Sequence, residues 1–221
     1  IVAYNLIDFK HIRQIIKYSR SETAILATTF FATLFLELEF AIYLGVLLSL
    51  VIFLARTSTP YIPELSIDED SKTGARKFIN VEKKTIASCP QVKVIRIDMS
   101  IYFGSVDYIQ NRIQKIREKE GIKHILIIGS GINFIDLAGA EALVSEHNRL
   151  KQEGGGLYFV GIKSSVYEFI ARTCFVSKIG NNNFFDSKKD ALRSIYKRLD
   201  KEACGNCDVR IFHECQQEFG K

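Results

Sequence analysis

The chain has 221 residues, of which 47% are hydrophobic and 25% are charged, and its formal net charge is +5. This length allows one large domain or a smaller domain with an appended segment, and the composition excludes a largely disordered chain. The five cysteines are odd in number and widely spaced, which argues against a secreted disulfide framework and favours a reducing, cytosol-facing location. The first residue is Ile1 and no leader-like region follows it, so we expect the C-terminal part of a longer protein.

The first segment, residues 1–22, is predicted to form a basic amphipathic helix beside a membrane. Lys10, Arg13, Lys17 and Arg20 are three, four and three residues apart, which places them on one helical face. Such a face next to an apolar span is typical of a helix lying on the anionic cytoplasmic membrane surface. We expect membrane lipids as its partner and no nucleic acid, because nothing suggests a groove-reading motif.

Residues 23–56 are predicted to hold two terminal transmembrane helices, built from Thr23–Leu36 and Phe40–Leu54. The stretch is almost wholly apolar apart from Glu37 and Glu39. Each helix would be about 21–23 Å long at 1.5 Å per residue, which is short of a hydrocarbon core of ~30 Å. One continuous helix would bury two carboxylates mid-membrane at ~2.5–3.5 kcal/mol each. We therefore expect a hairpin that turns near these acids, with both basic ends in the cytoplasm.

Two alternatives stay open for this segment. Glu37 and Glu39 are either loop carboxylates at the outer membrane surface or acids that influence ion entry or proton coupling. The hairpin itself could be a pair of buried soluble helices, although such apolar length is rare in soluble folds.

Residues 57–76 are predicted to be a linker, because they contain Pro60, Pro63 and an acidic run, and residues 77–200 an α/β domain. Buried strands are predicted at residues 92–97, 124–129 and 157–161. Helix starts are predicted at Ser105, at Ser164 or Ser165, at Ser187, and after Asp136. Alternating strands and helices indicate βαβ units with helices covering the sheet.

Asp136, within INFIDLAGAEAL (132–143), is the central candidate residue. Its carboxylate can accept from free backbone N–H groups at a helix start, which is worth ~1 kcal/mol over Ala, and the helix dipole favours the charge. Gly139 would then allow a close backbone approach. The nearby Gly129-Ser130-Gly131 lacks the remaining residues of a phosphate-binding loop and predicts a tight turn. His124 and His147 lack paired ligands and are predicted to be structural.

Residues 201–221 form a Cys-rich tail. Cys204, Cys207, His213 and Cys215 are chemically sufficient for tetrahedral zinc, but the His-x-Cys spacing is tight for one ion. Reduced, unmetallated cysteines are therefore the first interpretation, and zinc or a redox switch the second. We expect no other cofactor, and no enzyme, because no nucleophile–base motif is present.

The α/β part resembles a STAS domain, the module shared by sulfate transporters and anti-sigma-factor antagonists. The resemblance is carried by RIDMSIYFGSVDYI (96–109), HILIIGSGINFIDLAGAEAL (124–143) and LYFVGIKSSVYEFI (157–170). AIYLGVLLSLVIFLAR (41–56), just before it, resembles the last membrane segments of the SulP (sulfate permease) anion transporters. The order of short membrane helices, linker and STAS domain covers nearly the whole chain.

This resemblance implies a mixed-sheet STAS domain behind a two-helix transmembrane hairpin. The function it implies is the C-terminal part of a secondary-active symporter of an inorganic anion such as sulfate or bicarbonate. The anion would bind upstream of Ile1, the multi-pass protein would lie in the cell (inner) membrane as a homodimer, and the cytoplasmic STAS domain would regulate transport and assembly. The alternative is a membrane-tethered STAS module that binds partners without transport.

The resemblance also gives the Asp136 loop a regulatory meaning. In the anti-sigma antagonists a phosphorylatable serine follows this aspartate, whereas here the position is Leu137, which has no hydroxyl. Ser130 lies outside the matching position. Asp136, Leu137, Gly139 and Ser130 are therefore predicted to form a loop that faces a regulatory protein or small ligand, with Asp136 as a helix cap.

Overall fold

The computed structural model describes residues 8–69, 76–84 and 86–220. It divides into two compact units, Ile1–Thr57 and Ser58–Lys221.

The first unit is helical, with α2 at Phe9–Tyr18, α3 at Arg20–Phe35 and α4 at Leu38–Thr57. Ser19 has extended backbone angles and accepts a hydrogen bond from Glu22 N, so it ends α2 and caps α3. The predicted basic helix therefore ends at Tyr18, and Arg20 belongs to the next helix. Residues 1–7 of that prediction lie outside the described residues.

The predicted break between two apolar helices is present, at Leu36 and Glu37. Glu39 lies in the first turn of α4 and not in the turn between the helices. Small residues lie where α3 and α4 meet, because a Cβ on Gly45 would be 2.7 Å from Thr29 Oγ1, and Ala32 and Ala41 are buried. Small side chains of this kind let apolar helices approach closely.

In the part of the chain that the structure describes, α4 is the one helix long and apolar enough to cross a membrane. Its buried residues are Ala41 and Gly45, while most of its large apolar side chains are exposed. A helix with that exposure does not suit the core of a soluble protein, so the soluble-hairpin alternative gains no support.

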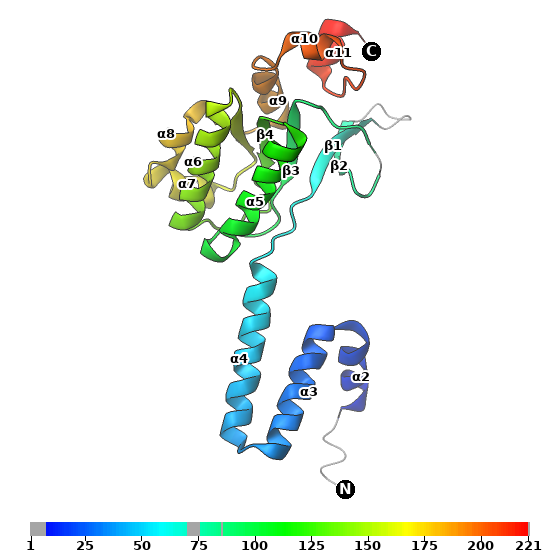
Figure 1. Ribbon diagram of the computed structural model, residues 1–221, viewed down its shortest axis with the longest axis vertical. Coiled ribbons are helices and arrows are strands. Elements are labelled where there is room, and N and C mark those ends of the chain that lie inside the picture. Colours follow the sequence, from blue (N-terminus) through cyan, green and yellow to red (C-terminus); the bar gives the residue numbers. More distant parts are fainter. Residues whose placement is uncertain (1–7, 70–75, 85, 221) are drawn as a thin grey trace. The chain divides into compact units, whose positions relative to one another are not determined.

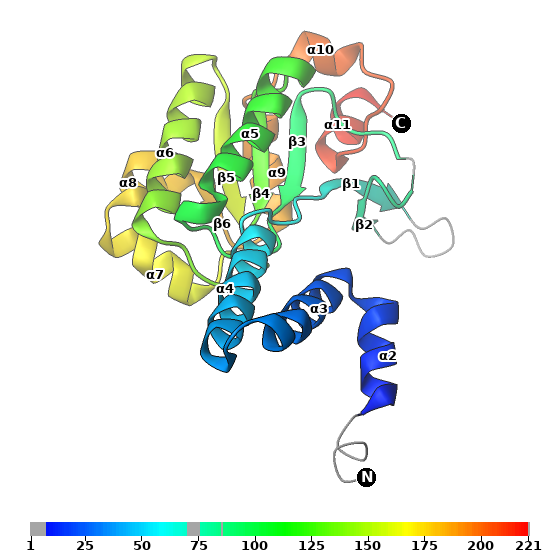
Figure 2. The ribbon, with the colours of Figure 1, turned by 60° about the horizontal axis from the view of Figure 1, so that its bottom comes forward.

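The second unit contains a six-stranded mixed sheet in the order β2-β1-β3-β4-β5-β6 (Figures 1 and 2). The strands are β1 Glu64–Glu69, β2 Arg76–Asn80, β3 Val92–Arg96, β4 His124–Ile128, β5 Gly156–Val160 and β6 Phe184–Phe185. β1 pairs antiparallel with β2 and β3, and β3 to β6 run parallel. The predicted α/β domain with a mixed sheet is confirmed.

The predicted linker at 57–76 is wrong at Glu64–Glu69 and at Arg76, because these residues form β1 and the start of β2. Leu65 is buried, and the Ser66 hydroxyl donates to the Ala87 carbonyl at 2.6 Å. Lys93 of β3 pairs with Glu64 of β1 and with Glu120, both at 2.6 Å. The segment therefore belongs to the domain. Residues 70–75 of the acidic stretch lie outside the described residues.

Helices cover both faces of the sheet. Alternate side chains of a strand point to opposite faces, so each strand contributes to two separate cores. Ile125 and Ile127 of β4 pack in one core with α5 (Phe103–Glu120), α6 (Leu137–Gln152), α7 (Ser164–Arg172) and α8 (Phe175–Ile179). Leu126 and Ile128 pack in the other core, with α9 (Lys188–Tyr196) and the tail helices α10 (Lys201–Gly205) and α11 (His213–Phe219). Figure 2 shows α5 and α6 on one side of the strands and α9 on the other.

Two of the predicted helix starts are confirmed and two are corrected. Asp136 caps α6 and Ser187 caps α9. Ser105 is instead the third residue of α5, where its hydroxyl accepts from Tyr102 N at 3.1 Å. The residue before α7 is Lys163, so neither Ser164 nor Ser165 is its cap.

Candidate functional site

Asp136 caps two helices with one carboxylate. Its Oδ1 accepts from Gly139 N at 2.7 Å, at the start of α6, and its Oδ2 accepts from Phe103 N at 2.9 Å, at the start of α5. Both helix N-termini present unpaired N–H groups and partial positive charge, which a carboxylate satisfies directly. The sequence predicted the first of these bonds; the second joins residues 33 positions apart and has no local sequence signal.

The backbone around Asp136 is tied to the segment that leads into α5. Asp136 N donates to the Ile101 carbonyl at 3.1 Å, and Ile101 N donates to the Phe134 carbonyl at 3.0 Å. A Cβ on Gly139 would lie 2.7 Å from the Ile101 oxygen, so only glycine permits this approach without a shift. The predicted role of Gly139 in close backbone packing is confirmed.

An apolar surface surrounds this carboxylate. The side chains of Phe103, Phe134 and Leu137 are 82%, 53% and 54% exposed, and we call these three residues the Asp136 surface. Exposed apolar groups gathered on a rigid backbone are typical of interaction sites. Sequence reasoning found Leu137 but missed Phe103 and Phe134, because exposure of an aromatic residue has no local signature.

The loop offers no acceptor for phosphate at the position after Asp136. Leu137 stands there, and Ser130 is an exposed residue of the preceding turn, closed by Ile132 N donating to the Gly129 carbonyl at 3.0 Å. A Cβ on Gly131 would lie 2.5 Å from the Ile97 oxygen, which accounts for glycine in this turn. The tight-turn prediction is confirmed, and the regulatory roles of Asp136, Leu137, Gly139 and Ser130 stay predictions.

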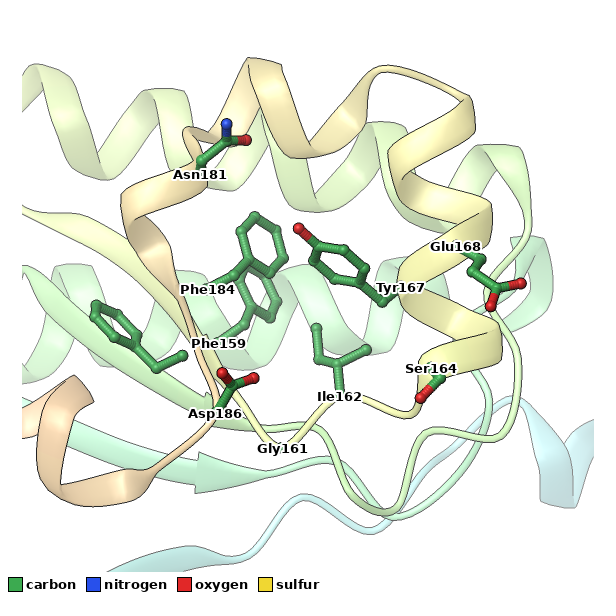
Figure 3. A pocket seen from close by; sticks show the side chains of 10 residues that line it. Phe159, Gly161, Ile162, Ser164, Tyr167, Glu168, Asn181, Phe184 and Asp186 are labelled. Atoms are coloured by element: carbon green, nitrogen blue, oxygen red, sulfur yellow. The ribbon is translucent and has the colours of Figure 1, made fainter.

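A separate cavity of about 520 Å³ opens where β5 and β6 end and α7 begins. Phe159 and Phe184 stack with their centroids 5.0 Å apart, and the edge of Tyr167 meets Phe184 at 5.9 Å (Figure 3). Asp186 lies beside the rings, whereas Glu168 points away from them. Among the described residues no Lys, Arg or His lines this cavity, whereas Glu168 and Asp186 do.

The tail cysteines lie together, but not with the histidine predicted to join them. Cys204, Cys207 and Cys215 line a small cavity with Cys89, while His213 is exposed and does not line it. Within the described ranges no three His, Cys, Asp or Glu side chains are placed to hold a metal ion. The geometry therefore gives the zinc interpretation no support.

The two internal histidines have structural partners. His147 Nδ1 is 3.3 Å from Leu157 N, which donates to it, and His124 Nδ1 lies 3.1 Å from the Tyr158 hydroxyl. Burial lowers the pKa of both histidines, so the neutral form is favoured. Both histidines therefore have structural hydrogen-bond partners, as predicted.

The STAS-domain family model matches residues 80–191. The chain belongs to the STAS-domain family. A putative sulfate transporter, YvdB of Bacillus subtilis, is 25% identical over 189 residues, covering 84% of this chain and 33% of its own length. The probable sulfate transporter 4.2 of Arabidopsis thaliana is 24% identical over 200 residues, covering 85% of this chain and 29% of its own.

A solved structure has the same fold across both units. The murine Slc26a9 anion transporter in its inward-facing state superposes with a TM-score of 0.72 at 21% identity, over 89% of this chain and 32% of that one. The resemblance to the SulP transporters with a STAS domain is confirmed, and this chain spans about a third of the relatives' length. The transporter relatives and the apolar helix α4 together support a membrane location.

Proposed function

We propose that this chain is part of a secondary-active inorganic anion transporter of the sulfate or bicarbonate type. The observation that carries the proposal is the extent of the match to YvdB. It covers 84% of the chain, more than the STAS-containing unit holds, so the similarity extends into the helical segment. A regulatory module that shared only its STAS domain with transporters would not show this continuity.

In this proposal the STAS domain regulates and assembles the transporter and catalyses no reaction. It lies in the cytoplasm, α3 and α4 are the terminal membrane helices, and two copies form a homodimer in the cell membrane. The Asp136 surface is the contact for a regulatory partner, because it combines exposed apolar side chains with a backbone held by two helix caps. The transported anion binds outside this chain.

The role of Glu37 and Glu39 within the proposal is that of carboxylates at the turn of the hairpin. Glu37 lies between the helices and Glu39 in the first turn of α4, and both are exposed. A negative charge at a helix N-terminus is stabilised by the helix dipole, and this explains an acidic residue at position 39 without a role in transport. Glu37→Gln and Glu39→Gln in the full transporter should leave uptake and its pH dependence unchanged.

Uptake by the complete protein tests the transport proposal. The full-length protein is reconstituted into vesicles, and entry of labelled sulfate and of bicarbonate is measured with and without a proton or sodium gradient. We expect gradient-dependent uptake of one of these anions. A folded, correctly inserted protein that moves neither anion, while its STAS domain still binds a cytoplasmic protein, would favour the tethered regulatory module instead.

A further inference from the structure

The Cys-rich tail forms a folded module. Asp200 caps α10 by accepting from Glu202 N at 2.9 Å and from Ala203 N at 3.3 Å. Arg210 donates to the carbonyls of Cys207, Phe219 and Gly205 at 3.0, 2.6 and 3.2 Å. One guanidinium thus pairs carbonyls at the ends of α10 and α11, which helices leave without intrahelical partners. The cysteines are held in fixed relative positions as a result.

Four of the five cysteines gather at one point between this module and the sheet. Cys89, before β3, and Cys204, Cys207 and Cys215 of the tail line the same small cavity. Cys89, Cys204 and Cys215 are buried, and Cys207 is half-buried. Burial, and then the neighbouring thiols Cys204 and Cys89, raise the pKa of Cys215 to about 11.

Cys204 and Cys207 are brought together by the backbone itself. Cys207 N donates to the Cys204 carbonyl at 3.3 Å, which closes a turn between residues i and i+3. Such turns bring the two Cα atoms within about 7 Å, and disulfides need a Cα separation of about 4.4–6.8 Å. Cys207 is the member that an oxidant in solution can reach, and Cys204 is the adjacent thiol that can resolve it.

We propose that Cys204 and Cys207 are a redox site of the domain that forms a reversible disulfide on reaction with hydrogen peroxide. Cys207 sulfur attacks the peroxide, its S–H bond and the O–O bond break, and Cys207 sulfenic acid and water form. Cys204 sulfur then attacks the sulfenic sulfur, losing its proton, and the hydroxyl leaves as a second water when the S–S bond forms. The peroxide is reduced and the two thiols are oxidised by two electrons in total.

The surroundings make this disulfide persistent once it has formed. Burial is the main cause that raises the pKa of Cys204, so Cys204 is a poor leaving thiolate when an external thiol attacks the bond. The disulfide would also fix the turn that supports the Arg210 hydrogen bonds. Oxidation would thereby make the tail more rigid where it packs on the sheet face that α9 also covers.

Trypsin separates the relevant cysteines and so gives a direct test. Cleavage at Lys and Arg leaves Cys204 and Cys207 together in residues 202–210, Cys215 in 211–221, Cys89 in 85–93 and Cys174 in 173–178. The full-length protein, purified reduced, is treated with hydrogen peroxide, alkylated, digested and analysed by mass spectrometry. We expect peptide 202–210 to lose two hydrogens, to escape alkylation, and to regain both thiols after dithiothreitol.

Two variants separate this site from general thiol oxidation. Cys207→Ser should abolish the internal disulfide, whereas Cys174→Ser, which removes an exposed cysteine elsewhere, should leave it unchanged. Alkylation of both thiols after peroxide in the folded protein would overturn the proposal. So would a cross-link from 202–210 to the Cys89 or Cys215 peptide, or stoichiometric bound zinc that protects the thiols. None of these outcomes depends on whether the protein transports an anion.

Discussion

At the scale of single residues, Asp136 does more than its position before a helix predicts. A carboxylate directly before an apolar helical pattern predicted the cap of α6. The bond to Phe103 N could not be predicted, because it depends on how the α5 segment folds back against the loop. The same limit applies to Cys89, which joins the tail cysteines from more than a hundred residues away.

Replacing Asp136 should therefore loosen two helix starts at once. We expect Asp136→Ala to lower the free energy of unfolding by about 2 kcal/mol, since a lost cap costs ~1 kcal/mol and two caps are lost here. Asp136→Asn should lose less, because its single amide oxygen still accepts. Urea unfolding followed by circular dichroism measures both. Glu141→Ala, on the exposed side of α6, is the control and should stay within about 0.5 kcal/mol; an equal loss there would contradict the double-cap explanation.

The two buried histidines make stability depend on pH. Their pKa values are lowered from 6.5 in the folded protein by burial, so the unfolded chain binds more protons below that pH. Their contribution is fully present above pH 6.5 and is lost as pH falls below it. We expect the urea midpoint to drop between pH 7.5 and pH 5.5.

Two histidine variants assign this effect. His147→Gln keeps an acceptor for Leu157 N but cannot titrate, so it should reduce the pH dependence. His213→Gln, at an exposed position, should leave the dependence as it is. If His147→Gln keeps the full pH dependence, His147 is not its source.

At the scale of elements, predictability follows the apolar pattern. β3, β4 and β5 were predicted because buried parallel strands are continuous apolar runs. β1, with the sequence ELSIDE, was missed because it is half polar and follows two prolines. It is nonetheless held by pairing on both sides and by the Glu64–Lys93 ion pair, in which the Lys93 side chain is 7% exposed.

The boundary of the domain can be tested by truncation. A protein beginning at residue 77 lacks β1, so it loses the buried Leu65 side chain and leaves Lys93 without Glu64. Burial of a leucine contributes ~1.5–3 kcal/mol, and β2 loses the strand with which it pairs, while Lys93 keeps its ion pair with Glu120. We expect residues 77–221 to lack a cooperative unfolding transition and residues 58–221 to show one. Equal stability of the two proteins would restore the linker interpretation.

At the scale of the whole molecule, the order of segments predicted the family, whereas the surface proposed for a partner required the structure. Leu137 was named from its place after Asp136, but the aromatic side chains beside it come from the α5 start and the preceding loop. The fold brings these parts together from separate segments, so no window of sequence contains the surface.

Polar substitutions on this surface should separate regulation from folding. Phe103→Ser and Leu137→Ser remove exposed side chains, so the unfolding free energy should change by no more than about 0.5 kcal/mol. In the full transporter we expect each to change the uptake rate or the fraction of dimer. Tyr108→Ser, 44% exposed on the same helix, is the matched control. Unchanged uptake and dimerisation in both surface variants would remove the Asp136 surface from regulation.

The two edges of the sheet limit how any partner can bind. β6 is two residues long, and β2, at the other edge, begins with Arg76 and Lys77. Short or charged edge strands discourage the addition of a further strand. Within the described strands, an extended peptide would therefore find no long apolar edge to join as a seventh strand. We therefore expect a partner of this domain to present a helix or a preformed loop, whose side chains can contact Phe103 and Leu137 without adding a strand to the sheet.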